Sequence, residues 1–238
     1  MARGGMGYFS LTRRVAEVSG LEPKALTWFY RALTRAPGAR AIHRRCVIQV
    51  LAQGVTHGVA LDLGAGPGLM TLEIAQRLPG LHLIGLDLAA HMVEAAHRRA
   101  KRIGLDGRGF WPQADGHFLP FADDSFDLVF SSFALHHWRD PLAVLNEVAR
   151  VLKPEGRYFI ADVCREVTLW QRLFAYLSIP VVSLPFGSYW GYGGYYESVR
   201  AGYTRNEARA LLRRSVLPPG EIKLDSTWFM PILTIASK

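Results

Sequence analysis

The stretch VALDLGAGPGLM (59–70) joins a short apolar run to a glycine-rich turn and decides the fold. The run 59–63 is typical of a strand buried on both faces. Glycines at 64, 66 and 68 follow at once, and a helical pattern from about Met70 to Leu78 comes next. Glycine lets the backbone turn sharply and approach a ligand closely. Strand, glycine loop and helix together predict the first unit of a doubly wound α/β sheet.

The same alternation continues along the chain. Further strands are expected at 81–87, near 110–114, at 126–132 and at 157–163, with helices at about 90–102 and from Asp140-Pro141 to a stop at Lys153-Pro154. Asp140 and Pro141 are suited to a helix N-cap and first turn. Such alternation requires right-handed crossovers and a mostly parallel sheet.

The two ends of the chain depart from this rhythm. Residues 1–58 are expected to form an N-terminal helical lid after a disordered basic leader, with helices ending at Gly20, at Pro37-Gly38 and, from Ala41 to Gln53, at Gly54. The second unit, 59–238, contains an insertion at about 165–203. It then closes with a helix at 204–215, capped by Thr204 and Glu207, and with two strands, EIKLDS and ILTIAS, as an antiparallel hairpin at the sheet edge. Seven strands are therefore expected.

Composition limits the setting of the protein. The 238 residues suffice for one α/β domain with a modest accessory element. Two distant cysteines give no disulfide framework or metal-ligand spacing, and no export signal is present, so a cytoplasmic protein without a metal is expected. The net charge of +8 lies in the flanks, because 59–163 carries more acids than bases. An anionic partner such as a membrane surface or nucleic acid, or simply a solvated arginine-rich surface, would account for it.

The glycine loop alone does not identify its ligand. Asp87 ends the second strand, where it can bind the hydroxyls of a ribose. A dinucleotide fingerprint beginning at Gly64 needs Gly or Ala at position 69, where this chain has Leu69. That small residue serves close packing beneath a pyrophosphate, so a nucleoside ligand without one fits better.

Four motifs in this order resemble the class I S-adenosylmethionine-dependent methyltransferases, in particular the group containing the ubiquinone/menaquinone C-methyltransferases. They are LDLGAGPG (61–68), IGLDLAAHMVEAA (84–96), QADGHFLPFADDSFDLVFSSFALHHW (113–138) and DPLAVLNEVARVLKPEGRYFIADV (140–163). The resemblance covers about 59–163, and more faintly 203–237. It implies a Rossmann-like fold and S-adenosylmethionine as cofactor.

The resemblance also implies how single positions contact the cofactor. Gly64 and Gly66 would lie under its methionine part, and Asp62 would orient the ammonium. Asp87 would bind both ribose hydroxyls, with Leu88 and Met92 near the adenine. Asp115 would accept from the adenine amino group, and the Gly116 amide would donate to a ring nitrogen. The backbone of Ser131 and Ser132 would meet the methionine end. Asp123, Asp124 and Asp127 are assigned to turns and solvent rather than to a metal.

The acceptor is less well defined by the sequence. His136 and His137 follow the fourth strand, where a histidine can act as general base; the alternative is that both are packing residues of the loop. The run 173–196 is aromatic and uncharged, but its prolines and glycines interrupt a spanning helix. We expect it to cover the substrate cavity, to contact a membrane surface or to form a homodimer interface. A small apolar or aromatic acceptor follows, such as a quinone precursor, a lipid or a secondary metabolite.

Three other functions fit parts of the sequence. The basic flanks are compatible with an RNA methyltransferase, but SSFALHH (131–137) lacks the Asn/Asp-Pro-Pro-aromatic motif of base-amino enzymes, so nucleic acid is not the expected partner. A nicotinamide-dependent oxidoreductase conflicts with Leu69. A noncatalytic binding module with the same fold conflicts with the intact glycines and acids.

Overall fold

The computed structural model describes residues 9–10, 37–183, 195–225, 227 and 230–237. A seven-stranded sheet forms its centre, in the order β4-β3-β2-β5-β6-β9-β8. The strands are β2 (His57–Leu63), β3 (Gly80–Leu86), β4 (Gly109–Phe110), β5 (Phe126–Ser132), β6 (Leu152–Val163), β8 (Gly220–Leu224) and β9 (Ile232–Ser237). β2 to β6 pair in parallel, and β9 runs antiparallel to both β6 and β8. The doubly wound sheet and its antiparallel closing hairpin are confirmed.

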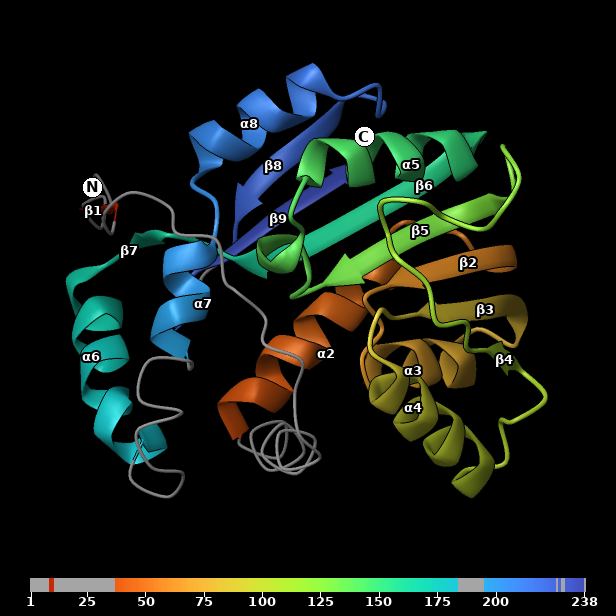
Figure 1. The fold of residues 1–238 in the computed structure, drawn as a ribbon, viewed down its shortest axis with the longest axis horizontal. Helices are drawn as coiled ribbons and strands as arrows, with labels where there is room; N and C mark the ends of the chain where they lie inside the picture. The colour runs from red at the N-terminus through yellow and green to blue at the C-terminus, as the bar shows by residue number, and fades with distance from the viewer. Residues whose placement is uncertain (1–8, 11–36, 184–194, 226, 228–229, 238) are drawn as a thin grey trace, which may run out of the picture.

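Helices cover both faces of the sheet (Figure 1). One face is packed by α5 (Pro141–Val151) and α8 (Arg205–Arg214), the other by α2 (Pro37–Leu51) and α3 (Leu69–Arg77), with α4 (Ala90–Arg102) beside α3. Successive strand residues face opposite layers. In β6, for example, Tyr158 and Ile160 join the α5 and α8 core, whereas Phe159 and Ala161 join that of α2 and α3. The sheet is therefore the middle layer of three.

Helix starts were predicted correctly where capping residues gave a strong local signal. Asp140 accepts from the backbone N–H groups of Leu142 and Ala143, each at 3.1 Å, as an N-cap should. Thr204 and Glu207 form the predicted capping box of α8. The predicted helix at 90–102 and strand at 126–132 match α4 and β5.

The junction between α5 and β6 differs from the expectation. The helix ends at Val151, and Lys153-Pro154 lies within β6, which begins five residues before the expected Arg157. Leu152 pairs with Phe126, and the next pair is Arg157 with Leu128, so the residues between them bulge out. Proline is tolerated there because a residue in a bulge does not have to donate a backbone N–H to the neighbouring strand. Lys153 also binds Asp127, whose carboxylate accepts from the Val59 N–H, so Asp127 joins strands rather than facing solvent.

The N-terminal expectations are only partly covered by the described residues. The helices expected to end at Gly20 and at Pro37-Gly38 lie almost wholly outside them. Pro37 and Gly38 belong to α2, which ends at Leu51, so the third predicted helix begins earlier than Ala41. A two-residue strand, β1 (Phe9–Ser10), was not predicted, and it pairs antiparallel with β7 (Glu166–Val167).

The insertion contains two described helices, α6 (Leu169–Ser183) and α7 (Tyr195–Ala201). Of the prolines and glycines expected to interrupt a spanning helix, Pro180 lies within α6, which continues to Ser183. A proline near a helix end removes a single backbone hydrogen bond, which a helix can lose. Within the described part of the chain, no helix has both the length and the apolar character needed to cross a bilayer.

Candidate functional site

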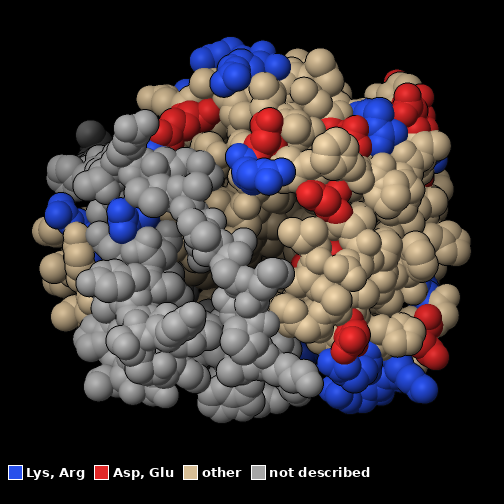
Figure 2. All heavy atoms as spheres, in the orientation of Figure 1, with Lys and Arg blue, Asp and Glu red and all other residues tan. Residues whose placement is uncertain are grey.

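The carboxyl ends of the parallel strands β2 and β5 lie side by side. Between these two strands the strand order changes direction. β3 lies on one side of β2 and β5 on the other, so the loops after β2 and after β5 leave the sheet together. Ligands of open α/β sheets bind at such a switch point. The space-filling view shows a hollow near where β5 ends in Figure 1, with acidic atoms visible at its described edge (Figure 2).

Asp62, the penultimate residue of β2, is a buried carboxylate with one oxygen unsatisfied. The residue is 1% exposed. Its Oδ2 accepts from the Thr71 hydroxyl at 2.5 Å, whereas its buried Oδ1 has no hydrogen-bond partner among the described residues. Burial raises the pKa of Asp62 to about 7; the Thr71 bond opposes this, and the charge of Asp87 adds to it. A buried carboxylate oxygen needs a donor, so this atom fits a cationic ligand group.

The glycine loop shapes the space beside Asp62. Gly64 and Gly66 have φ of +76° and +53°, in the left-handed region that favours glycine. A Cβ on Gly64 would lie 2.6 Å from the Ala134 Cβ, so the loop after β2 packs tightly against the residues after β5. A Cβ on Gly66 would have no described atom within 4 Å. The backbone of Gly66 is thus open to a ligand.

Asp87 connects this loop to the end of β3. One carboxylate oxygen accepts from the Gly66 N–H at 2.8 Å and the other from the Ala89 N–H at 2.9 Å. Burial raises the pKa of Asp87 above its usual value, against the lowering effect of these two bonds. Each oxygen keeps a second lone pair for a ligand hydroxyl. Leu88, next in the chain, is exposed, and Met92 lies half-buried in α4.

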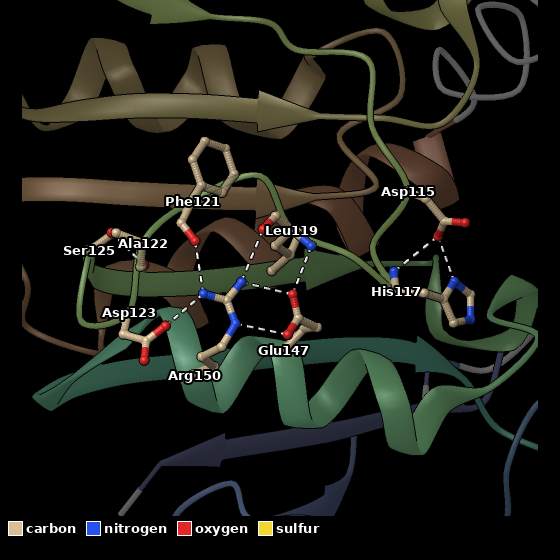
Figure 3. A network of polar contacts seen from close by, with 9 residues as sticks. All are labelled: Asp115, His117, Leu119, Phe121, Ala122, Asp123, Ser125, Glu147 and Arg150. Carbon is tan, nitrogen blue, oxygen red and sulfur yellow. Dashed lines mark hydrogen bonds and ion pairs between the residues drawn. The ribbon is translucent and has the colours of Figure 1, made fainter.

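Asp115 and Gly116 lie in the loop after β4. Asp115 Oδ1 accepts from the His117 backbone N–H at 2.9 Å and from its ring Nδ1 at 2.5 Å (Figure 3). Burial acts to raise the pKa of Asp115, but the bonds from His117 outweigh it and lower that pKa. The His117 Nε2 accepts from the Asp140 N–H at 3.1 Å, which fixes the Nδ1–H tautomer. Sequence reasoning missed His117, which fixes Asp115 beside α5.

Arg150 holds the rest of that loop against α5. Its guanidinium donates to the carbonyl oxygens of Phe121 and Leu119 at 2.8 and 3.0 Å, and to the carboxylates of Asp123 and Glu147 (Figure 3). The bond to Glu147, then that to Asp123, raises the pKa of Arg150 above its usual value. This cluster was not predicted, although the three-residue spacing of Glu147 and Arg150 on one helix indicated an ion pair.

The two serines that end β5 have different surroundings. The hydroxyl of Ser131 is buried and donates to the Leu63 carbonyl at 2.6 Å, which ties β5 to the end of β2. Ser132 is half-buried beside it. Both therefore lie at the switch point, next to the glycine loop.

His136, in the 3₁₀ helix η1 (Leu135–His137), forms a buried pair with Asp162 of β6. Its backbone N–H and its ring Nδ1 both lie 2.6 Å from the Asp162 carboxylate. An ionised carboxylate only accepts, so Nδ1 carries the proton and Nε2 the lone pair. Sequence reasoning missed Asp162. The sequence did contain a signal for it. Asp162 is an acid one residue before the end of an apolar strand, and that strand is the neighbour of the strand that precedes His136.

His137 has a more exposed position than His136. The two rings lie 4.0 Å apart between centroids. Desolvation, and then the charge of His136, lower the pKa of His137 to about 4. This shift keeps the His137 ring neutral at pH 7. The ring of His136 is oriented by its carboxylate partner, Asp162.

The strand order and the glycine loop at the switch point define a Rossmann-like α/β protein of the doubly wound class. Residues 61–160 match the profile of a family described as a methyltransferase domain. Over these residues the chain is therefore similar to methyltransferase domains.

Known proteins of this kind resemble the chain in sequence and in fold. A demethylmenaquinone methyltransferase from Thermus thermophilus is 37% identical over 102 residues, 43% of this chain and 46% of that protein. A 27-O-demethylrifamycin SV methyltransferase from Amycolatopsis mediterranei is 35% identical over 102 residues, 43% of this chain and 37% of that protein. The chain thus spans less than half the length of these two relatives. The crystal structure of an S-adenosylmethionine-dependent methyltransferase from Aquifex aeolicus has the same fold, with a TM-score of 0.59, 18% identity and coverage of 80% of this chain and 87% of that one.

Proposed function

We propose that this chain binds S-adenosylmethionine where β2 and β3 end and transfers its methyl group to a small apolar or aromatic acceptor. The observation that carries the proposal is the buried Asp62 oxygen, which has no hydrogen-bond partner among the described residues, beside the open backbone of Gly66. The cofactor's methionine ammonium supplies the cationic donor that this oxygen lacks. The match of 61–160 to a methyltransferase domain supports the same cofactor.

The remaining contacts follow from the positions of the predicted residues. The second lone pairs of Asp87 would accept from the two ribose hydroxyls, and the oxygen of Asp115 that His117 leaves open would accept from the adenine amino group. Exposed Leu88 would gain an apolar partner from the adenine. The other proposed contacts are made by Gly64, Gly66, Met92, Gly116, Ser131 and Ser132.

The cofactor supplies a methyl group already activated by a positively charged sulfur, so the protein has to align, exclude water and move a proton. We assign the proton to His136. Asp162 holds its Nδ1–H, and Nε2 is the ring nitrogen that would accept the proton from an O–H or N–H nucleophile. Asp162 acts as a positioning residue, because it fixes the ring and stabilises the imidazolium that forms. We do not assign the proton to His137.

The apolar acceptor is supported by two observations. The relatives named above act on a demethylmenaquinone and a demethylrifamycin, according to their names. The run 173–196 is uncharged and rich in aromatic residues, and it begins in α6. Apolar linings with few polar groups are typical of sites for such ligands.

Transfer of a labelled methyl group tests the proposal. The purified chain is incubated with methyl-labelled S-adenosylmethionine in a cell extract, which is then partitioned between organic and aqueous phases, with Asp87→Ala as the control for weakened cofactor binding. We expect label in the organic phase with the wild type, and less of it with the variant. Label confined to the aqueous phase would contradict the apolar acceptor, and its release by ribonuclease would identify RNA. Tight binding of S-adenosylhomocysteine without methyl transfer to any component of an extract would contradict the proposal that the protein is an enzyme.

A further inference from the structure

Helix α6 presents apolar side chains outward. Leu169, Trp170 and Leu177 are 58, 74 and 72% exposed, and Leu173 is exposed with them. At roughly 100° per residue these four positions fall within an arc of about 100°. The polar Gln171 lies nearly opposite and is buried. Among the described side chains of α6, these four apolar residues are therefore exposed while the polar Gln171 is buried, which reverses the pattern usual for a surface helix.

Gln171 fixes this orientation. Its side-chain amide donates to the Thr227 carbonyl at 2.7 Å, and its oxygen accepts from the Thr168 N–H at 2.9 Å. In Figure 1, α6 lies at the edge of the molecule beside α7, away from the sheet. The outward turn of the apolar side is therefore built into the helix start by buried hydrogen bonds, and it is a patch of the kind that marks an interaction site.

Arg172 is the one charged residue of α6, and its charge is positive. No acidic residue occurs between Glu166 and Glu197. Arg172, at the edge of the face, lies with its guanidinium 5.8 Å from the centre of the Tyr176 ring. The chain as a whole carries a net charge of +8. Tryptophan, tyrosine and arginine beside leucine are the residues that bind the boundary between lipid headgroups and acyl chains.

We propose that the outward face of α6, formed by Leu169, Trp170, Leu173 and Leu177, docks onto an anionic lipid membrane, with the helix lying in the plane of the surface. At 15 residues α6 is about 22 Å long, shorter than the ~30 Å hydrocarbon core, so it lies on the bilayer rather than across it. A second copy of the same face would bring Arg172 toward its own counterpart across a two-fold axis, whereas anionic headgroups complement it. The proposal goes beyond the methyl transfer and does not depend on it.

Sedimentation with vesicles tests the docking without any assay of activity. The wild type is mixed with phosphatidylcholine vesicles, with and without phosphatidylglycerol, and compared with the double variant Trp170→Ser/Leu177→Ser. The matched control is Phe110→Ser/Val216→Ser, which removes two equally exposed apolar side chains elsewhere on the surface. Thermal melting and S-adenosylhomocysteine binding establish that each variant is folded.

We expect the wild type and the control to bind the anionic vesicles, and the α6 variant to bind them at least about tenfold more weakly. Arg172→Gln should weaken binding to anionic vesicles and leave binding to pure phosphatidylcholine unchanged. Absence of wild-type binding, or equal losses in the α6 variant and the control, would overturn the proposal. A dimer in solution that the α6 variant dissociates, without vesicle binding by the wild type, would overturn it in favour of a second copy.

Discussion

Asp62 and Asp162 are equally buried, at 1% exposure, one residue before the ends of two strands of the same sheet. Asp162 is satisfied by the protein, since its oxygens accept from the backbone and ring of His136 and from the Val163 N–H. Asp62 has one bond, from Thr71, and one oxygen without a described partner. The difference assigns them different tasks: Asp62 needs a ligand, whereas Asp162 holds a side chain.

The largest expected effect is a loss of kcat when Asp162 no longer holds His136. Asp162→Asn keeps the size of the side chain but removes the charge that orients His136 and stabilises its protonated form. We expect kcat to fall about a hundredfold or more, within the range of general-base catalysis, with little change in the Kd for S-adenosylhomocysteine. Steady-state kinetics and calorimetry measure the two quantities. A wild-type kcat in the variant would remove His136 from the proton transfer.

A smaller effect is expected from the carboxylate that joins the glycine loop to β3. Asp87→Ala removes the acceptor of the Gly66 and Ala89 N–H groups together with the proposed ribose contact. We expect the Kd for S-adenosylhomocysteine to rise by about an order of magnitude or more, because charge-assisted bonds are lost. Asp106→Ala, at an exposed turn, is the matched control. An unchanged Kd in folded Asp87→Ala would place the ribose elsewhere.

The smallest effect concerns the support of the site rather than either aspartate. Arg150→Met removes the bonds to two loop carbonyls and two carboxylates. The free energy of unfolding should fall by about 1–3 kcal/mol, since partly buried acceptors lose their donor. Arg98→Met removes an exposed ion pair with Glu94 and should change the free energy of unfolding by no more than about 0.5 kcal/mol. Urea denaturation compares them, and equal losses would mean that Arg150 does not hold the loop.

The sequence predicted those elements whose signals are local. Apolar runs located β2, β3 and β5, and capping residues located the starts of α5 and α8, because these features depend on neighbours within a few positions. The bulge at Lys153-Pro154 was missed, since it depends on how β6 pairs with β5.

The candidate site divides in the same way. The glycines and Asp87 were recognised from one contiguous motif and the strand after it. The His136 and Asp162 pair joins residues 26 positions apart, and it exists only because β5 and β6 are parallel neighbours. The sequence also could not predict that one oxygen of Asp62 has no described partner. That depends on which groups the fold places beside a buried carboxylate.

Titration of S-adenosylhomocysteine at pH 8 and pH 6 into the wild type and Asp62→Asn tests the central claim most directly. Burial raises the pKa of Asp62 to about 7, above its usual value, so the ligand-free protein holds a proton there at pH 6 that must leave when the ammonium binds. The account predicts that wild-type affinity is about tenfold weaker at pH 6, and that Asp62→Asn binds weakly at both values without this step. Equal wild-type affinity at both values, or the same step in Asp62→Asn, would contradict it.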